Sequence, residues 1–349
     1  MSFLIEENIS LAEMTTLKIG GKAKFFAAAK SEMEVVEALK FAEENNLETF
    51  ILGGGSNVLI ADEGFDGLVL QIALKGIFVE RAKDKILVTA NAGEDWDAFC
   101  EFCVAENLPG VECLSGIPGL VGGTPVQNVG AYGQEVSETI FAVKVFDRAD
   151  SQVKKLSNAD CGFAYRSSIF NTSQKNRYIV LAVTFSLTRD GEPKIVYKDL
   201  RELFGGKMPT LQKTRQAVLK IRAAKSMVID ERDPNSKSAG SFFKNPIVAN
   251  ERFAEIEKRA KTFGIESVPH FKFNENNVKI PAAWLIENSG FHKGFRQGNA
   301  AISTKHTLAI VNLGNASARD VWRLKDEIQA KVKEIFDVEL KPEPIFVGF

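Results

Sequence analysis

Residues 52–60 read LGGGSNVLI, and residues 115–133 read SGIPGLVGGTPVQNVGAYG. The first stretch has a short apolar run on each side of its glycines, which predicts a strand, a tight loop and a second strand. The third glycine of the G-x-G-x-x-G fingerprint is missing, because position 58 is valine, and the residues after it are typical of a strand rather than a helix. The stretch therefore argues against a Rossmann dinucleotide fold.

The second stretch combines many glycines with an absence of charge. Six of the 18 residues in 116–133 are glycine, which is more than an ordinary surface loop requires. Both stretches could be structural turns only, but successive amides without a Cβ atom can also form a nest that binds an anion. We therefore predict that two glycine clusters hold a dinucleotide between strand-rich subdomains.

The composition of the whole chain is that of an ordinary globular protein. Its 349 residues include 44 Lys and Arg against 45 Asp and Glu, and 45% are hydrophobic. A net charge of −1 gives no general attraction to nucleic acid or to anionic membranes. No run of 18 apolar residues and no signal-peptide pattern is present, so we expect a cytoplasmic protein of two or three domains without nucleic-acid or membrane partners.

Apolar periodicity predicts an α+β protein. A capping box at Ser31 and Glu34 starts the first expected helix, with Val35, Val36, Leu39 and Ala42 on its apolar face. Further helices are expected over Glu94–Asn107, Asn250–Gly264, Pro281–Ser289 and Ser317–Phe336, and strands over Thr49–Leu52, Val58–Ile60, Leu68–Ile72, Ile86–Ala90, Ala142–Phe146 and Tyr178–Leu187. The proline-interrupted tail 340–349 is expected to be extended.

The cysteines and histidines do not form a metal-binding pattern. Cys100 and Cys103 share a helical apolar stripe with Trp96, so we interpret them as core residues, and Cys113 and Cys161 stand alone. His270, His292 and His306 are widely spaced. No metal site is expected.

Charge is concentrated in one segment. Residues 207–225 contain six basic residues and no acidic one. This positive charge suits a diphosphate ligand, and the change in composition after Lys207 predicts a domain boundary nearby.

Three local motifs put polar groups in unusual settings. Arg166 stands among aromatic and apolar residues, Ser241 lies between Gly240 and two phenylalanines, and Glu343 lies between two prolines. An isolated charge in apolar surroundings is unfavourable unless it is paired. Each motif could also be structural, as a paired core arginine, a turn serine and a solvated glutamate.

Seven motifs together resemble one family, the UDP-N-acetylenolpyruvoylglucosamine reductases, which are flavoenzymes of bacterial peptidoglycan synthesis. In chain order they are TTLKIGGKA (15–23), LGGGSNVLI (52–60), SGIPGLVGGTPVQNVGAYGQE (115–135), CGFAYRSSIF (161–170), GSFFKNP (240–246), IPAAWLIENSGFHKG (280–294) and PEP (342–344). The resemblance extends over nearly the whole chain.

The resemblance implies an FAD-binding fold of the vanillyl-alcohol-oxidase kind. Two FAD-binding subdomains would cover residues 1–66 and 67–218, and a substrate-binding domain would cover residues 219–349, with the C-terminal tail returning to the active site. The implied cofactor-binding residues are Gly53, Gly54, Gly55, Ser56, Asn57, Ser115, Gly116, Ile117, Pro118, Gly119, Gly122, Gly123, Asn128, Gly130, Ala131 and Tyr132. The chain is expected to be a monomer.

The resemblance also implies the reaction, an NADPH-dependent reduction of UDP-N-acetylglucosamine enolpyruvate to UDP-N-acetylmuramate in cell-wall biogenesis. Hydride would come from N5 of the flavin and a proton from Ser241, while Arg166 and Glu343 stabilise the enolate-like species. Tyr197, Lys225 and Asn245 would contact the UDP-sugar, and NADPH and substrate would use one pocket in turn. Tyr197 could equally be an ordinary exposed tyrosine.

Two other functions stay open at this point. One is an FAD-dependent sugar or alcohol oxidase of the same fold, which would react quickly with oxygen. The other is a flavin-containing binding protein without turnover. The combination of Arg166, Ser241 and Glu343 argues against the second, because binding alone does not require these three side chains.

Overall fold

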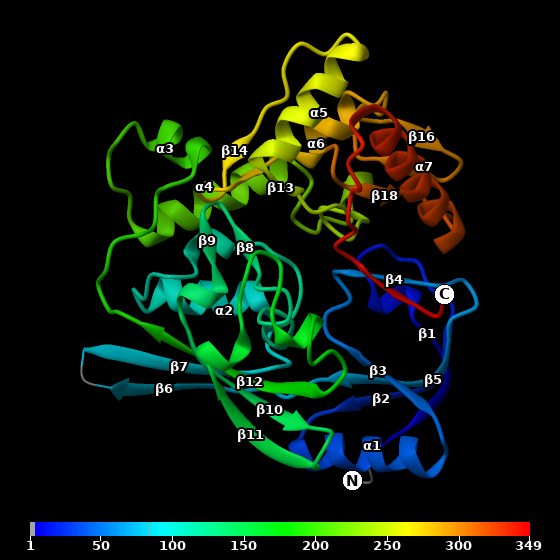
Figure 1. Cartoon of the computed structure of the whole chain (residues 1–349). Helices are drawn as coiled ribbons and strands as arrows, with labels where there is room; N and C mark the ends of the chain where they lie inside the picture. The colour runs from blue at the N-terminus through cyan, green and yellow to red at the C-terminus, as the bar shows by residue number, and fades with distance from the viewer. Residues whose placement is uncertain (1–3, 83) are drawn as a thin grey trace. The chain divides into compact units, whose positions relative to one another are not determined.

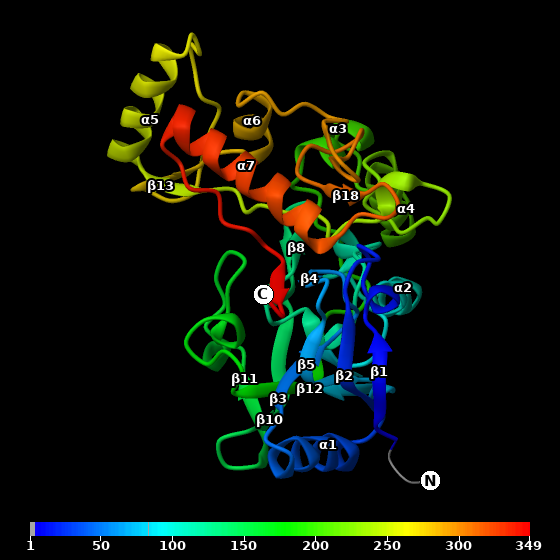
Figure 2. The same ribbon diagram turned by 90° about the vertical axis from the view of Figure 1, so that its right-hand side faces the viewer.

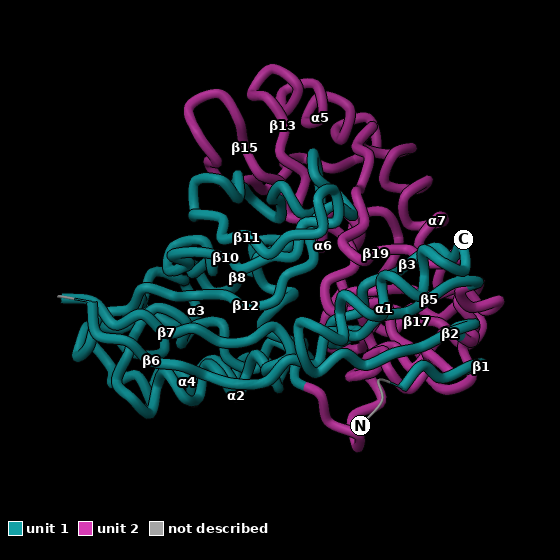
Figure 3. Tube along the Cα trace, turned by 90° about the horizontal axis from the view of Figure 1, so that it is seen from below, with its two compact units in different colours: residues 1–9, 23–55, 66–228 teal, residues 10–22, 56–65, 229–349 magenta. Residues whose placement is uncertain are grey.

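The computed structural model describes residues 4–82 and 84–349. The chain groups into two compact units, each assembled from separate stretches of sequence, as the colours of Figure 3 show. Unit 1 consists of residues 1–9, 23–55 and 66–228, and unit 2 consists of residues 10–22, 56–65 and 229–349. The three-part division at residues 66 and 218 stays a prediction.

Unit 1 contains a four-stranded sheet with the order β1-β2-β5-β3 (Figure 1). Its strands are β1 (Glu6–Ser10), β2 (Lys22–Ala29), β5 (Phe65–Ile72) and β3 (Glu48–Leu52). Strands β3 and β5 are parallel, with Leu52 opposite Gln71. The expected strand and the three-glycine loop after it are therefore present, and the loop follows β3, which is an edge strand of this sheet.

Helix α1 (Glu32–Glu44) begins where the capping box predicts, because the Ser31 hydroxyl accepts a hydrogen bond from the Glu34 amide at 3.2 Å. Its apolar face differs from the expected one by one side chain. Val35, Ala38 and Ala42 are buried, whereas Val36 is 43% exposed. The prediction for Val36 was wrong because a residue next to Val35 points about 100° away around the helix.

The second sheet of unit 1 is antiparallel, with the order β11-β10-β12-β7-β6. The strands are β6 (Ile77–Ala82), β7 (Lys85–Asn91), β10 (Ile140–Asp147), β11 (Gln152–Ser157) and β12 (Tyr178–Leu187). Val143 on β10 faces Val183 on β12. Side chains of both sheets and of α2 (Trp96–Ala105) share one hydrophobic core, which includes Leu70, Val88 and Trp96.

The cysteines belong to this core, as predicted. Cys100 and Cys103 are fully buried on α2, and burial raises the pKa of both thiols. Among the described residues, no group of three or more His, Cys, Asp or Glu side chains could hold a metal ion.

Two helices of unit 1 were not predicted. They are α3 (Lys198–Phe204) and α4 (Leu211–Ala224). Helix α4 occupies the basic stretch and buries Leu211, Thr214, Ala217 and Val218 on one face. The helix was not predicted because its four basic residues interrupt the apolar pattern of this face. Within residues 4–82 and 84–349, no helix is both long enough and apolar enough to span a membrane.

Unit 2 is built from helices and short strands around a separate core that includes Phe242, Leu285 and Leu324. Its helices are α5 (Asn250–Thr262), α6 (Ala282–Glu287) and α7 (Ala318–Phe336), and its strands are β4 (Val58–Ile60), β13 (Ile247–Ala249), β14 (Phe271–Lys272), β15 (Asn277–Lys279), β16 (Arg296–Gln297), β17 (Ala300–Ile302), β18 (Ile310–Asn312) and β19 (Ile345–Val347). After α7 the chain runs on as an extended tail to the C-terminus (Figure 2). The tail forms β19, which pairs in parallel with β4.

The last residue of β10 in unit 1, Asp147, has a buried carboxylate. Asp147 has no exposed side-chain surface, and it accepts hydrogen bonds from Arg177 at 2.8 and 3.0 Å and from Lys154 at 2.7 Å. The hydrogen bonds from Arg177 are the main reason that the pKa of Asp147 lies well below its usual value. A depressed carboxylate pKa stabilises the folded state above the unfolded pKa of about 3.9 and loses this contribution as the pH falls.

We therefore expect Asp147→Asn to lower the free energy of unfolding at pH 7 by on the order of 2 kcal/mol, the scale of hydrogen bonds to charged partners. The difference between variant and wild type should shrink as the pH falls below about 4, because Asp147 of the unfolded chain then takes up a proton while Asp147 of the folded protein is still charged. Thermal unfolding of both proteins at several pH values measures this. A difference that stays constant down to the lowest pH would contradict the assignment.

Candidate functional site

The two glycine clusters contact each other in unit 1. A Cβ atom built on Gly54 would lie 2.7 Å from the Cα of Gly119, and its other nearest atoms are also backbone. A Cβ atom on Gly53 would have no heavy atom within 4 Å. Glycine is therefore required at position 54, because two loops far apart in the sequence pass each other backbone to backbone.

Several amides of these loops have no acceptor. Within the described part of the chain, the backbone N–H groups of Gly54, Gly55 and Ser56 donate to no protein atom, and those of Ile117 and Gly119 do not either. Four of these amides, those of Gly54, Gly55, Ile117 and Gly119, lie in unit 1 on two touching loops and form an arrangement that fits an anionic ligand.

The other amides of the second cluster serve the fold itself. Gly122 donates to Ala92 at 2.9 Å, Gly123 donates to Leu120 at 3.0 Å, and Gly116 donates to the Asp97 carboxylate at 2.6 Å. Within 115–124, the amides that have no acceptor among the described residues are those of Ile117, Gly119 and Leu120, and the binding of a diphosphate by this cluster stays a prediction.

Two acidic residues that the sequence analysis missed hold the second cluster in place. The Asp97 carboxylate accepts a hydrogen bond from the Gly116 amide and forms a bidentate ion pair with Arg215. Nη1 and Nη2 of Arg215 lie 2.5 and 2.9 Å from its two oxygens. Burial alone would raise the pKa of Asp97, but the bonds from Arg215 and Gly116 leave it below its usual value. Glu112, which is fully buried, accepts from the Lys194 amide at 2.9 Å and from Gln134 at 3.2 Å.

Arg166 lies beside the end of the second cluster. Its Nη2 donates to the Gly130 carbonyl at 2.6 Å, and the guanidinium lies 5.2 Å from the ring centre of Tyr165. Arg166, Asn128 and Tyr132 all have φ values in the left-handed region, at 52°, 45° and 51°. Such values in non-glycine residues are unfavourable and gather at functional sites. The Asn128 side chain fixes this arrangement by donating to Glu135 at 2.9 Å and to the Ala164 carbonyl at 3.1 Å.

Two predicted substrate residues lie near Tyr132 in unit 1. The rings of Tyr132 and Tyr197 pack edge to face, with 5.2 Å between their centres. Lys225 donates to Asp199 at 3.3 Å, two residues beyond Tyr197. Tyr197 is 39% exposed, so it is partly covered and partly open to solvent. The structure brings these residues together although 65 positions separate Tyr132 from Tyr197.

Ser241 and Glu343 occupy neighbouring segments of unit 2. The Glu343 amide donates to the Phe242 carbonyl at 2.9 Å, and Phe243 and Pro342 form an antiparallel bridge. The Asn57 side chain donates to the Glu343 carbonyl at 3.1 Å, and the Ile345 amide donates back to the Asn57 carbonyl at 3.0 Å. Asn57, predicted as a cofactor residue, thus anchors the backbone of Glu343.

A histidine that the sequence analysis set aside stands next to the predicted proton donor. Nε2 of His306 lies 3.4 Å from the Ser241 hydroxyl oxygen. Asn245, four residues after Ser241, accepts a hydrogen bond from the Ala282 amide at 2.8 Å and so holds the start of α6. No spacing rule in the sequence could have joined His306 to Ser241, because 65 residues separate them.

Similarity to known proteins identifies the family of this chain. A model described as the FAD binding domain matches residues 23–157, and a model described as the C-terminal domain of UDP-N-acetylenolpyruvoylglucosamine reductase matches residues 233–347. A UDP-N-acetylenolpyruvoylglucosamine reductase of Thermobifida fusca is 43% identical over 355 residues, which covers 100% of this chain and 99% of the relative. The chain belongs to the UDP-N-acetylenolpyruvoylglucosamine reductase family.

Further relatives extend the same result. The reductase of Streptomyces coelicolor is 43% identical over 345 residues, covering 97% of this chain and 89% of the relative. The crystal structure of the reductase from Thermus caldophilus superposes with a TM-score of 0.67 at 25% identity and covers 99% of this chain and 100% of that one. The α+β fold with an FAD-binding domain, predicted from the sequence, is confirmed.

The residues of unit 1 fit the FAD that this reductase family uses. FAD carries a diphosphate, and amides without acceptors at Gly54, Gly55, Ile117 and Gly119 match such an anion. The close approach at Gly54 leaves no side chain between the two loops.

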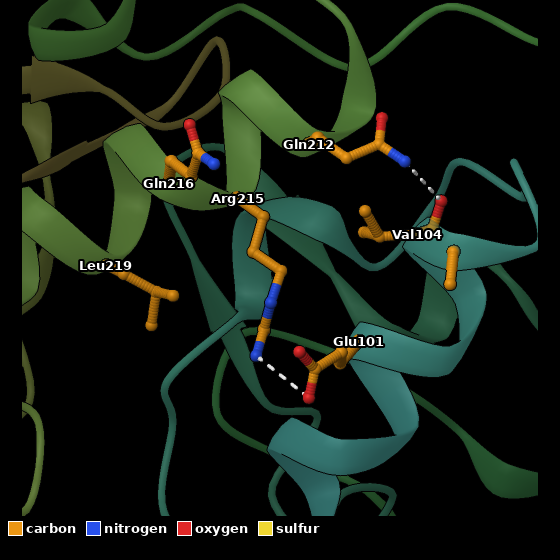
Figure 4. Close-up of a pocket in the computed structure, with 7 residues that line it drawn as sticks. Glu101, Val104, Gln212, Arg215, Gln216 and Leu219 are labelled. Atoms are coloured by element: carbon orange, nitrogen blue, oxygen red, sulfur yellow. Dashed lines mark hydrogen bonds and ion pairs between the residues drawn. The ribbon is translucent and has the colours of Figure 1, made fainter.

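A surface cavity of about 320 Å³ elsewhere in this reductase holds none of the predicted site residues. It lies between α2 and α4 and is lined by Glu101, Val104, Ala105, Gln212, Arg215, Gln216 and Leu219. Figure 4 shows the Gln212 side chain pointing to the Val104 carbonyl and Arg215 facing Glu101. Nε2 of Gln212 donates to the Val104 carbonyl oxygen at 3.3 Å, and Nη2 of Arg215 lies 3.9 Å from a carboxylate oxygen of Glu101. These contacts join α2 to α4, so we interpret the cavity as a gap in helix packing.

Proposed function

We propose that this chain reduces the enolpyruvyl group of a UDP-linked amino sugar to a lactyl group in peptidoglycan synthesis, with NADPH as the hydride source and FAD as the cofactor. Membership of the family carries the proposal. The structural observation that supports it is the pairing of the Ser241 segment with Glu343, since the Phe242 carbonyl accepts from the Glu343 amide. Phe242 and Glu343 are 101 positions apart in the sequence, and a turn serine beside a solvated glutamate would require no such pairing.

FAD supplies a two-electron carrier that accepts hydride from NADPH and delivers it to a carbon of the enolpyruvyl group. The amides of Gly54, Gly55, Ile117 and Gly119 would hold its diphosphate. These donors are fixed by the fold before the cofactor arrives, so binding requires little rearrangement.

Arg166 and Glu343 would stabilise the negative charge that develops when hydride reaches the substrate. The planar guanidinium of Arg166 is held at one nitrogen by the Gly130 carbonyl, which fixes the direction in which its charge points. Glu343 is held through its backbone on both sides, by Phe242 and Asn57. A charge fixed in advance stabilises a transition state without reorganisation.

Ser241 would donate the proton that completes the reduction. Phe242 and Phe243 beside it are buried, at 0% and 1% exposure, which limits water on that side of the hydroxyl. His306 is close enough to hold the hydroxyl in one orientation and to exchange a proton with it.

Tyr197, Lys225 and Asn245 would contact the UDP-sugar. Asn245 uses its amide oxygen on α6, which leaves its NH₂ group as the donor for substrate.

Two half-reactions test this function. Anaerobic addition of NADPH to the purified yellow protein should bleach the visible flavin absorbance, and addition of the enolpyruvyl UDP-sugar should restore it. The oxidase alternative predicts rapid recovery with oxygen alone and no requirement for NADPH. A protein that binds no flavin, or whose reduced flavin ignores the UDP-sugar, would overturn the proposal.

The monomeric state and the cytoplasmic location belong to the same proposal and rest on the sequence. Light scattering of the purified protein measures the first, and cell fractionation measures the second.

A further inference from the structure

Arg222 is a buried cation with no role in the reaction proposed above. It lies in the last turn of α4 and is 6% exposed. Its Nη2 donates to the Met227 carbonyl at 2.7 Å, and its guanidinium also bonds the Tyr132 hydroxyl. Its Nε is buried, and no partner for it exists among the described residues. A buried donor without an acceptor is unfavourable by about 1–3 kcal/mol.

The unpartnered Nε faces the second glycine cluster. A Cβ atom built on Gly116 would stand 3.4 Å from this nitrogen. Gly116 immediately precedes Ile117, whose amide also has no acceptor, and Gly119 has another such amide. The buried guanidinium of Arg222 therefore lies beside a short loop that carries two amides without an acceptor.

No carboxylate of the described residues forms an ion pair with Arg222. Asp97, whose charge acts on it, is already held by Arg215 at 2.5 and 2.9 Å. Burial lowers the pKa of Arg222 from its ordinary value, the direction expected for a cation removed from water without full compensation. Other basic residues of this segment are satisfied within unit 1, since Lys225 is paired with Asp199 and Arg215 with Asp97.

We propose that Arg222 is an FAD-binding residue, whose guanidinium compensates negative charge on the cofactor. The inference rests on the proposed function, because it requires that FAD is the ligand. Position 222 lies outside both matched family models, which end at residue 157 and begin at residue 233. Two parts of FAD carry suitable charge: the diphosphate, at all times, and the flavin ring once it is reduced. With Arg222, helix α4 joins the two glycine loops as a part of the cofactor site.

Three variants of the holoenzyme test the assignment. Arg222→Gln removes the charge, Arg222→Lys keeps it without the planar fork, and Lys220→Gln removes a charge from the exposed face of the same helix. Release of FAD on dilution is followed by the rise in flavin fluorescence. The flavin midpoint potential is measured by equilibration with a redox dye, and thermal unfolding checks that each variant is folded.

We expect Arg222→Gln to release FAD about tenfold faster, Arg222→Lys to fall between it and wild type, and Lys220→Gln to match wild type. Faster release at an unchanged potential assigns the charge to the diphosphate. A midpoint potential that becomes more negative assigns it to the reduced ring. If folded Arg222→Gln keeps both wild-type release and wild-type potential, the inference is wrong while the reductase function stands. If wild type holds no FAD, the proposed function itself fails.

Discussion

In Ser241→Ala, NADPH should reduce the flavin at the wild-type rate, while reoxidation by the enolpyruvyl substrate should slow by about 10²- to 10⁴-fold, the usual contribution of a general acid. The two half-reactions separate because hydride transfer from NADPH involves no proton from Ser241. Stopped-flow absorbance under anaerobic conditions measures each step alone. Loss of the hydroxyl leaves Phe242 and Phe243 in the core, so the fold should be unaffected.

Ser289→Ala is the matched control. The Ser289 hydroxyl is also in unit 2, but it is buried and donates to the Leu285 carbonyl at 2.8 Å. This variant should keep both half-reactions at the wild-type rate, with at most a small loss of stability. Ser241→Cys restores a donor with an ordinary pKa near 8.5 and should recover part of the reoxidation rate. Wild-type reoxidation by Ser241→Ala would remove Ser241 from the reaction.

Gly54→Ala should weaken FAD binding by about 10- to 100-fold. The added methyl carbon would lie 2.7 Å from the Gly119 Cα and 3.2 Å from the Leu120 amide nitrogen. All of these atoms are backbone and cannot rotate away, so the two loops must separate, at the 1–3 kcal/mol typical of overpacking. Separation moves the free amides of Gly54 and Gly119 apart. Flavin fluorescence during titration with FAD measures the change in affinity.

Gly53→Ala provides the comparison for this prediction, because a Cβ atom at position 53 has no protein heavy atom within 4 Å. The thermal unfolding midpoint of the protein without FAD should be unchanged in Gly53→Ala and lowered in Gly54→Ala. Equal midpoints and equal FAD affinities for the two variants would show that the contact between the loops is unimportant.

The sequence predicted the regular elements well wherever a local pattern defines them. Strand β12 has the predicted bounds, Tyr178–Leu187, and α7 begins after Ser317, whose hydroxyl accepts from the Asp320 amide at 3.1 Å. Periodicity and capping residues are local signals, and they act within a few positions. Helix α4 was missed because its charges outnumber the apolar residues of its buried face.

The partners of the site residues could not be predicted, because long-range pairing determines them. Val58 on β4 lies opposite Ile345, and this parallel pairing places Asn57 against Glu343. Asp97 has the features of an ordinary first-turn acid of a helix, yet it holds the Gly116 amide and Arg215. Nothing within a few positions of these residues specifies such contacts.

The most direct test of the central claim is a crystal structure of the protein with FAD bound. The account predicts that the amides of Gly54, Gly55, Ile117 and Gly119 contact the diphosphate, and that Arg166, Ser241 and Glu343 lie on one face of the flavin ring. A diphosphate bound away from both glycine loops, or a Ser241 hydroxyl remote from flavin N5, would contradict it.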